Sequence, residues 1–164
     1  MAILGLGLLG LTTRAVGSAE ALYRRLKQPI RLSLQDFKTS WQTQAFDAYC
    51  CAAGNDAATL LRGILVQLPP VNGQRCFKAF CRLCPHEMCY VDFTADPDRI
   101  PQNVTPRPDH PMFVCPCHLS VFDADGEPLS GPATRGLFQF RLTVDADRIT
   151  ITEVEEEVLW WLKE

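Results

Sequence analysis

The sequence predicts an all-β protein: an antiparallel β sandwich or barrel-like domain, preceded by an N-terminal helical segment. Many short apolar or alternating runs are spread along the chain, and Gly and Pro turns separate them. The chain has 164 residues, of which 47% are hydrophobic. This length suits one domain with some additional chain, and this composition can supply a core of ordinary size.

The N-terminal helical segment is expected to cover residues 1–28, which are apolar and then basic, and to end at Pro29. The apolar run at residues 2–11 is too short to span a bilayer, which needs about 20 residues. Three interpretations stay open for residues 2–22: a marginal membrane anchor, an export signal whose start lies upstream, and a helix buried in a soluble protein. We favour membrane association.

Strands are expected where residues alternate in polarity or are rich in β-branched and aromatic types. These segments are residues 30–34, 60–68, 75–82, 112–114, 137–144 and 149–154. We expect Pro69-Pro70 to end the second of them and Asn72-Gly73 to form a hairpin turn before the third. The five prolines in residues 91–111 predict an irregular loop, because proline has no N–H to donate to a sheet. An acidic tail, residues 155–164, follows the last strand.

Charge and cysteine content argue against two broad classes of protein. The net charge of −3 offers no basic field for nucleic acid, so no nucleic-acid partner is expected. Eight cysteines are many for this length, but histidines lie inside the two Cys-rich segments, which argues against a secreted disulfide scaffold. Cys50, Cys51 and Cys76 lie outside both segments and are expected to be buried thiols.

Two short segments carry the chemistry: CPHEMC at residues 84–89 and CPCHLS at residues 115–120. Each supplies one Cys and one His close together, and each carries a further Cys. Two thiolates and two imidazoles are the ligands of a Rieske [2Fe–2S] centre, in which two His replace two Cys on one iron. Because imidazole is neutral, the replacement raises the reduction potential above that of an all-Cys cluster. Electron transfer is therefore the leading hypothesis, and the two remaining cysteines are the right number for one disulfide.

A zinc site is the competing hypothesis. Cys81 and Cys84 form a C-x2-C unit that could complete a Cys3His tetrahedron with Cys115 and His118. Such a site would leave the other histidine and cysteines of the two segments without a role. In the Rieske interpretation, Cys81 is instead a strand residue in apolar surroundings.

The two segments resemble the paired motifs of high-potential, disulfide-containing Rieske proteins. These are the iron–sulfur subunits of cytochrome bc- and bf-type complexes and the similar small subunit of arsenite oxidase. The resemblance covers about residues 60–152. It implies an antiparallel β-sandwich Rieske domain at residues 29–154, with an inserted cluster-binding subdomain at residues 76–136, and one [2Fe–2S] cluster per chain.

The same resemblance implies the metal ligands. Cys84 and Cys115 would hold one iron of the cluster, and His86 and His118 would hold the other. Both loops that carry these residues would then have to meet at their tips.

Four further residues have a role implied by the resemblance. Cys89 and Cys117 would form a disulfide beside the cluster, a pair that Rieske ferredoxins and ring-hydroxylating oxygenases usually lack. Ser120 would donate a hydrogen bond to a bridging sulfide. Pro132 would belong to a loop at residues 131–133 that covers the cluster.

The expected function is electron transfer as the iron–sulfur subunit of a quinol:cytochrome oxidoreductase. His86 and His118 would act as the catalytic residues, taking a proton from the quinol while its electron passes to a cytochrome. The expected partners are a membrane cytochrome b-type subunit and a cytochrome c or f-type acceptor in a multi-subunit complex. The cluster domain would lie on the periplasmic or lumenal side of a membrane. The alternatives are a relay subunit of an arsenite-oxidase-like molybdenum enzyme and a soluble Rieske electron carrier.

Three features depart from the family pattern. Phe122 stands where quinol-oxidising members usually carry a Tyr that donates a hydrogen bond to a Cys sulfur, so a lower potential is expected. Glu87 replaces the hydrophobic residue that usually follows the first His. The gap between the two segments, residues 90–114, is longer than expected because it contains the Pro-rich loop.

Overall fold

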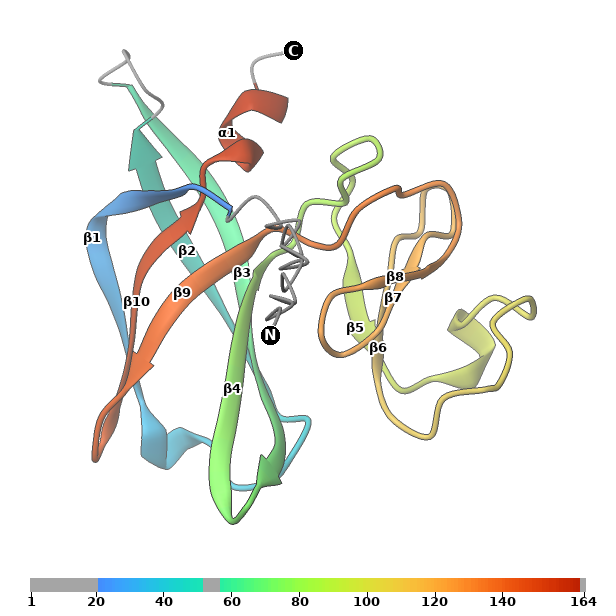
Figure 1. Ribbon diagram of the computed structural model, residues 1–164, viewed down its shortest axis with the longest axis horizontal. Helices are drawn as coiled ribbons and strands as arrows, with labels where there is room; N and C mark the ends of the chain where they lie inside the picture. Colours follow the sequence, from blue (N-terminus) through green and yellow to red (C-terminus); the bar gives the residue numbers. More distant parts are fainter. Residues whose placement is uncertain (1–20, 52–56, 163–164) are drawn as a thin grey trace, which may run out of the picture.

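The computed structural model describes residues 21–51 and 57–162, in which most regular structure is β-strand (Figure 1). Six strands form a closed antiparallel barrel in the order β1-β10-β9-β4-β3-β2. Their bounds are β1 (Tyr23–Ser33), β2 (Thr43–Cys51), β3 (Ala58–Val71), β4 (Gln74–Cys81), β9 (Gln139–Val144) and β10 (Arg148–Glu155). The predicted all-β antiparallel class is confirmed, with the long strands closed into a barrel.

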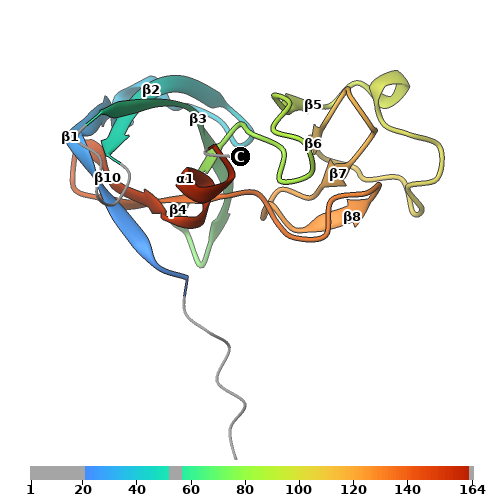
Figure 2. The ribbon, with the colours of Figure 1, turned by 90° about the horizontal axis from the view of Figure 1, so that it is seen from above.

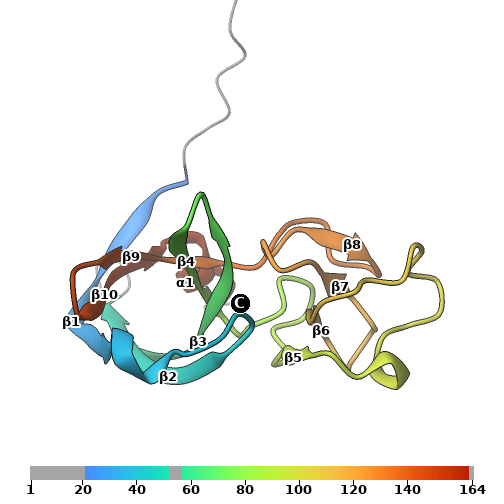
Figure 3. The same cartoon turned by 90° about the horizontal axis from the view of Figure 1, so that it is seen from below.

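A second sheet, in the order β5-β6-β7-β8, is inserted between β4 and β9. Its strands are β5 (Asp92–Thr94), β6 (Met112–Val114), β7 (Val121–Phe122) and β8 (Pro128–Ser130). This sheet lies beside the barrel, as both end-on views show (Figures 2 and 3). The described helical segments are η1 (Leu34–Asp36), η2 (Pro97–Arg99) and α1 (Glu157–Trp161). The boundaries of the cluster-binding subdomain at residues 76–136 stay a prediction.

Residues 23–28 belong to β1, so the expectation of a helix up to Pro29 is wrong for them. β1 pairs with β10 on both sides of an irregularity between Arg25 and Ile30. Pro29 falls within this interruption, where no ladder hydrogen bond is required of it, and the strand continues past it. The buried side chain of Leu26 adds to the barrel core.

Residues 1–20, where an anchor or export signal is expected, lie outside the described residues. In the part of the chain that the structure does describe, no helix is long and apolar enough to cross a membrane. Membrane association therefore stays a prediction.

β3 continues through Pro69-Pro70 to Val71, which contradicts the strand end expected at the prolines. The pairing of β3 with β4 shifts register between Leu68 and Val71, and the prolines lie in this irregular stretch. Asn72 and Gly73 have positive φ angles of 51° and 75° and form the expected tight turn into β4.

The Pro-rich segment at residues 91–111 is more regular than expected, because it contains β5 and η2. β5 pairs with β6 along its whole length. All five prolines of the segment lie outside β5, so the argument that excludes proline from a sheet holds for each of them.

An apolar core between the barrel and the second sheet positions the site. This inter-sheet core contains Ile64, Val66, Phe80, Cys84, Val91, Phe113, Cys115, Phe122, Ala133 and Leu137. Phe80 of β4 and Phe113 of β6 are fully buried, and their ring centroids lie 5.1 Å apart in an edge arrangement. Aromatic side chains of this size dominate the energetics of such a core. The packing that joins the two sheets therefore also buries two of the expected ligands.

Arg135 lies in the segment that leads from the second sheet back to β9. Its contacts anchor this segment to β10 and α1. Its guanidinium pairs with Glu155 of β10 at 2.5 Å and with Glu157 of α1. It also lies 4.3 Å from the centroid of the Phe138 ring. Because Glu155 is buried, its carboxylate depends on this partner for compensation of its charge.

We expect Arg135→Met to lower the free energy of unfolding by about 2–3 kcal/mol, since it leaves the buried Glu155 without its charged partner. Arg25→Met is the matched control. The Arg25 side chain is 91% exposed and contacts Glu153 at 3.9 Å, so its loss should change stability by at most about 0.5 kcal/mol. Urea denaturation followed by far-UV circular dichroism measures both, and equal effects would contradict the prediction.

Candidate metal centre

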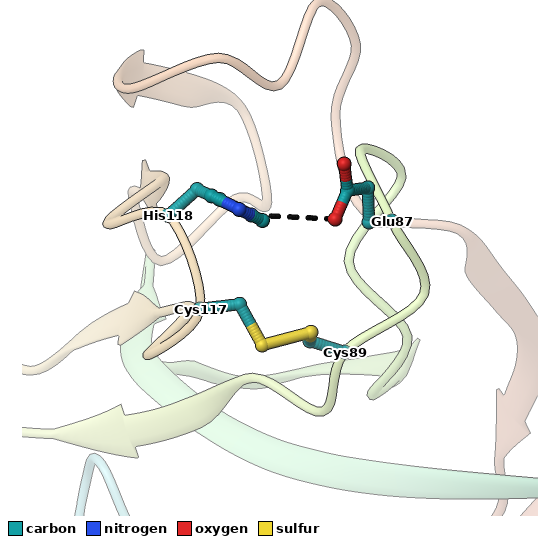
Figure 4. Close-up of a disulfide and its surroundings, with 4 residues drawn as sticks. All are labelled: Glu87, Cys89, Cys117 and His118. Carbon is teal, nitrogen blue, oxygen red and sulfur yellow. Dashed lines mark ion pairs between the residues drawn. A yellow bond between two sulfur atoms is a disulfide. The ribbon is translucent and has the colours of Figure 1, made fainter.

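Two loops approach each other at one edge of the inter-sheet core. Loop 1, residues 84–89, connects β4 to β5, and loop 2, residues 115–120, connects β6 to β7. Figure 4 shows them facing each other, joined by a disulfide. Because each loop starts at the end of a strand that packs against the core, the first Cys of each is held in the interior.

Loop 1 is a tight turn closed by its own backbone. The N–H of Cys84 donates to the carbonyl of Cys89 at 2.8 Å, and the N–H of Met88 donates to the carbonyl of Cys84 at 2.9 Å. Met88 has a positive φ of 56°, in the left-handed region that only a few per cent of non-glycine residues adopt. The turn therefore has a defined shape before any metal is bound.

Loop 2 repeats this geometry. The N–H of Cys115 donates to the carbonyl of Ser120 at 2.8 Å, and the N–H of Leu119 donates to the carbonyl of Cys115 at 3.1 Å. Leu119, like its counterpart in loop 1, has a positive φ, here of 59°. The two motifs thus form matched turns, although their histidines stand two and three residues after the first Cys.

The thiols of Cys84 and Cys115 lie together in the interior, with 0% and 2% of each residue exposed. Burial, together with a smaller effect of the neighbouring Cys115, raises the pKa of the Cys84 thiol to about 11. The backbone N–H of His86 and the hydroxyl of Ser120 donate to the sulfur and oppose this rise in pKa. As iron ligands, both thiols would have to lose their protons, so metal binding here would release protons.

His86 and His118 lie on the outer side of the same site. Their ring centroids are 4.9 Å apart and the rings are nearly perpendicular, at 88°. His86 is half-buried and His118 is exposed. With two buried thiols behind two outward imidazoles, the donor set suits a two-iron cluster whose irons differ in their ligands.

A disulfide between Cys89 and Cys117 joins the tips of the two loops (Figure 4). This is the pairing that the family resemblance implies. It spans 28 residues of sequence, so it links two loops that the Pro-rich segment separates along the chain. The two loops that carry the expected ligands are therefore covalently held together.

Glu87 extends from loop 1 across the gap toward loop 2. Its Oε2 lies 3.6 Å from Nδ1 of His118, and 59% of its side chain is exposed (Figure 4). This distance is longer than a hydrogen bond, so the contact is an electrostatic one.

The loop at residues 131–133 packs directly on loop 2. The hydroxyl of Ser120, which is fully buried, accepts a hydrogen bond from the N–H of Ala133 at 3.1 Å. Gly131 has a φ of +90°, and a Cβ there would lie 2.5 Å from Cα of Ser120. Pro132 is exposed between them. The sequence indicated that Ala133 belongs to this loop but not that it bonds Ser120, because a backbone donor on a small apolar residue leaves no compositional signal.

The competing Cys3His zinc site does not match this geometry. The side chain of Cys81 belongs to the core inside the barrel, whereas Cys84 belongs to the inter-sheet core. Burial raises the pKa of the Cys81 thiol to about 12, as expected for an inert strand residue in apolar surroundings.

Cys50, Cys76 and His110 lie outside the two loops, in other parts of the fold. Cys50 is buried as expected, but Cys76 is only half-buried, and the Cys51 side chain lies outside the description. His110 stacks on Trp41 with ring centroids 5.2 Å apart, which fastens the Pro-rich segment to the loop before β2.

The chain matches the family model of the Rieske [2Fe-2S] domain over residues 52–141, which is more than half of its length. It belongs to this family. A [2Fe–2S] cluster of the Rieske type is accordingly its cofactor, and electron transfer is its chemistry. The assignment of Cys84, His86, Cys115 and His118 as the ligands stays our proposal.

Curated relatives agree with the family. The cytochrome b6-f complex iron-sulfur subunit of Synechococcus sp. (strain RCC307) is 28% identical over 85 residues, which is 48% of this chain and 40% of that subunit. The cytochrome bc1 complex Rieske iron-sulfur subunit of Mycobacterium tuberculosis (strain CDC 1551 / Oshkosh) is 36% identical over 73 residues, 43% of this chain and 14% of that subunit. The matches thus span less than half the length of these relatives.

Two solved structures are similar in part. The plasma membrane Rieske protein PetC3 of Synechocystis PCC 6803 aligns with a TM-score of 0.41 at 24% identity, over 64% of this chain and 84% of that one. The ferredoxin of carbazole 1,9a-dioxygenase from Nocardioides aromaticivorans IC177 aligns with a TM-score of 0.45 at 21% identity, over 76% and 97%.

We expect Cys84→Ser to abolish the cluster, because it removes a buried thiolate ligand, whereas Cys81→Ser should retain it. The two cysteines are equally buried, so general damage to the core would affect both. Iron analysis and EPR of the reduced protein measure the outcome, with a rhombic signal of low average g expected from the parent and from Cys81→Ser. Stoichiometric zinc with no such signal in the parent would contradict the Rieske site.

Gly131→Ala is expected to speed the loss of the cluster, because the added methyl displaces the covering loop from Ser120. Gly73→Ala is the control, since its φ is also positive, +75°, but nothing lies within 4 Å of the added atom. Gly73→Ala should lower the free energy of unfolding only through the strain of a left-handed alanine, about 1 kcal/mol. Visible absorbance during mild heating measures cluster loss, and similar rates in the two variants would contradict the role of the contact.

Proposed function

We propose that this chain is the iron–sulfur subunit of a quinol:cytochrome oxidoreductase of the bc or bf type. The arrangement of the two imidazoles carries the proposal. His86 and His118 lie side by side at the outer surface, in front of buried thiols. An external donor can therefore reach both rings without rearrangement of the fold.

The residues of the site divide the chemistry between them. When bound, the [2Fe–2S] cluster supplies one-electron redox chemistry. Cys84 and Cys115 would hold one of its irons in the interior, and His86 and His118 the other. Each imidazole has a second ring nitrogen, which can accept a hydrogen bond from a quinol hydroxyl and then hold its proton.

The proposed reaction needs partner subunits to accept the remaining electron and proton of the quinol. A quinol loses two electrons and two protons when it becomes a quinone. One electron and one proton would pass to this chain, with the electron leaving to a cytochrome c or f-type acceptor. The second electron would go to a membrane cytochrome b-type subunit and the second proton to a base on that subunit or to solvent.

The curated relatives support the same complex. They are iron–sulfur subunits of the cytochrome b6-f and cytochrome bc1 complexes. Identities of 28–36% over part of each chain leave the donor and acceptor of this chain as proposals. We place the cluster domain on the periplasmic or lumenal side of a membrane by the same proposal.

Purification from native membranes tests this function. A tagged chain, extracted in a mild detergent, is expected to copurify with a subunit that binds b-type haem, identified by mass spectrometry and its absorption spectrum. Addition of a quinol to this complex should reduce the cluster, as seen by EPR, while an untagged strain gives neither result.

Two results would contradict the proposal, and each would support a different function. Copurification with a molybdenum subunit, and no reduction by quinol, would indicate the relay role of an arsenite-oxidase-like enzyme. Recovery of the chain without membranes, with reduction by a soluble reductase, would indicate a soluble carrier.

A further inference from the structure

Glu87 introduces a charge where the rest of the site has none. Loop 1, loop 2 and the covering residues 131–134 contain no other Asp or Glu and no Lys or Arg. Arg82, two residues before loop 1, is paired with Asp92. Arg135, which follows the covering residues, is paired with Glu155 and Glu157. No cation on these loops offsets the Glu87 carboxylate.

The carboxylate is directed at a proposed ligand. Its Oε2 lies 3.6 Å from Nδ1 of His118, and the side chain points from loop 1 toward loop 2 (Figure 4). The distance is too long for a hydrogen bond, so the interaction does not depend on which ring nitrogen is committed to iron. Coulomb interactions act through space, and they are stronger beside a partly buried site than in bulk water.

We propose that Glu87 sets the reduction potential of the cluster, holding it below the value that the same site would have with a neutral residue. The oxidised site carries one more positive charge than the reduced site. A carboxylate beside His118 therefore stabilises the oxidised form more than the reduced form. Glu87 acts through His118 as a tuning residue, and its effect does not depend on the identity of the electron donor.

Two substitutions change this charge in graded steps. Glu87→Gln removes one negative charge with little change of shape, and Glu87→Lys replaces it by a positive one. We expect both to raise the midpoint potential, with the Lys variant shifted about twice as far as the Gln variant, because its change of charge is twice as large. Glu87→Asp keeps the charge and should stay close to the parent.

Asp145→Asn is the control for net charge. Asp145 is an exposed carboxylate in the turn between β9 and β10, at the end of the barrel away from the two loops (Figure 1). Its removal should leave the potential unchanged. Redox titrations at constant pH, followed by EPR of the reduced cluster, measure all four variants against the parent.

A salt series adds a second readout. Because the Glu87 side chain is largely exposed, mobile ions screen it, and the difference in potential between parent and Glu87→Gln should shrink as ionic strength rises. A Glu87→Gln potential equal to that of the parent would overturn the proposal. So would an equal shift in Asp145→Asn, or loss of the cluster in every variant that lacks the carboxylate. None of these results bears on whether a quinol is the donor.

Discussion

The burial of Cys84 and Cys115 in the core between the barrel and the second sheet is the constraint on which the rest of the structure depends. A buried thiolate without compensation is unfavourable, as the raised pKa of Cys84 indicates. At these proposed ligands, a positively charged iron would remove this penalty, because it favours the deprotonated sulfur. The same core contains Phe80 and Phe113, so the packing that joins the sheets also places the two thiols together. With Cys84 and Cys115 as ligands, binding of the cofactor and docking of the second sheet on the barrel would therefore be coupled through one set of side chains.

The surface of the site is organised by different forces. Backbone hydrogen bonds shape each loop, and the disulfide between Cys89 and Cys117 joins them. The buried hydroxyl of Ser120 connects loop 2 to the covering loop through the N–H of Ala133. None of these contacts uses His86 or His118. The imidazoles are thus free to face outward while the frame that holds them stays unchanged, which is the requirement for a redox site that meets its partners at its edge.

Sequence reasoning worked where the signal is local and failed where it depends on pairing between distant segments. The two motifs, the all-β class and the turn at Asn72-Gly73 could be predicted, because the residues that define each are close along the chain. Residues 23–28 were misassigned because their strand forms by pairing with β10, more than a hundred residues away, and with β2. β5 was missed for the same reason, since a three-residue strand inside a Pro-rich segment is defined by β6 alone. The contact of Glu87 with His118 joins two loops, so the sequence could identify the unusual residue but not the atom that it faces.

Glu87 and Phe122 alter the site from opposite sides. Phe122 is fully buried in the core that holds the two thiols, and a phenyl ring has no hydroxyl to donate toward a sulfur. Glu87 lies outside and brings a negative charge to the imidazole edge. A missing donor and an added anion both disfavour the form that carries the extra electron, so their effects on the potential add rather than cancel. Electron transfer into such a site is favourable only from a donor of correspondingly lower potential. The two departures from the family pattern therefore act together on one property, the match between this cluster and its electron donor.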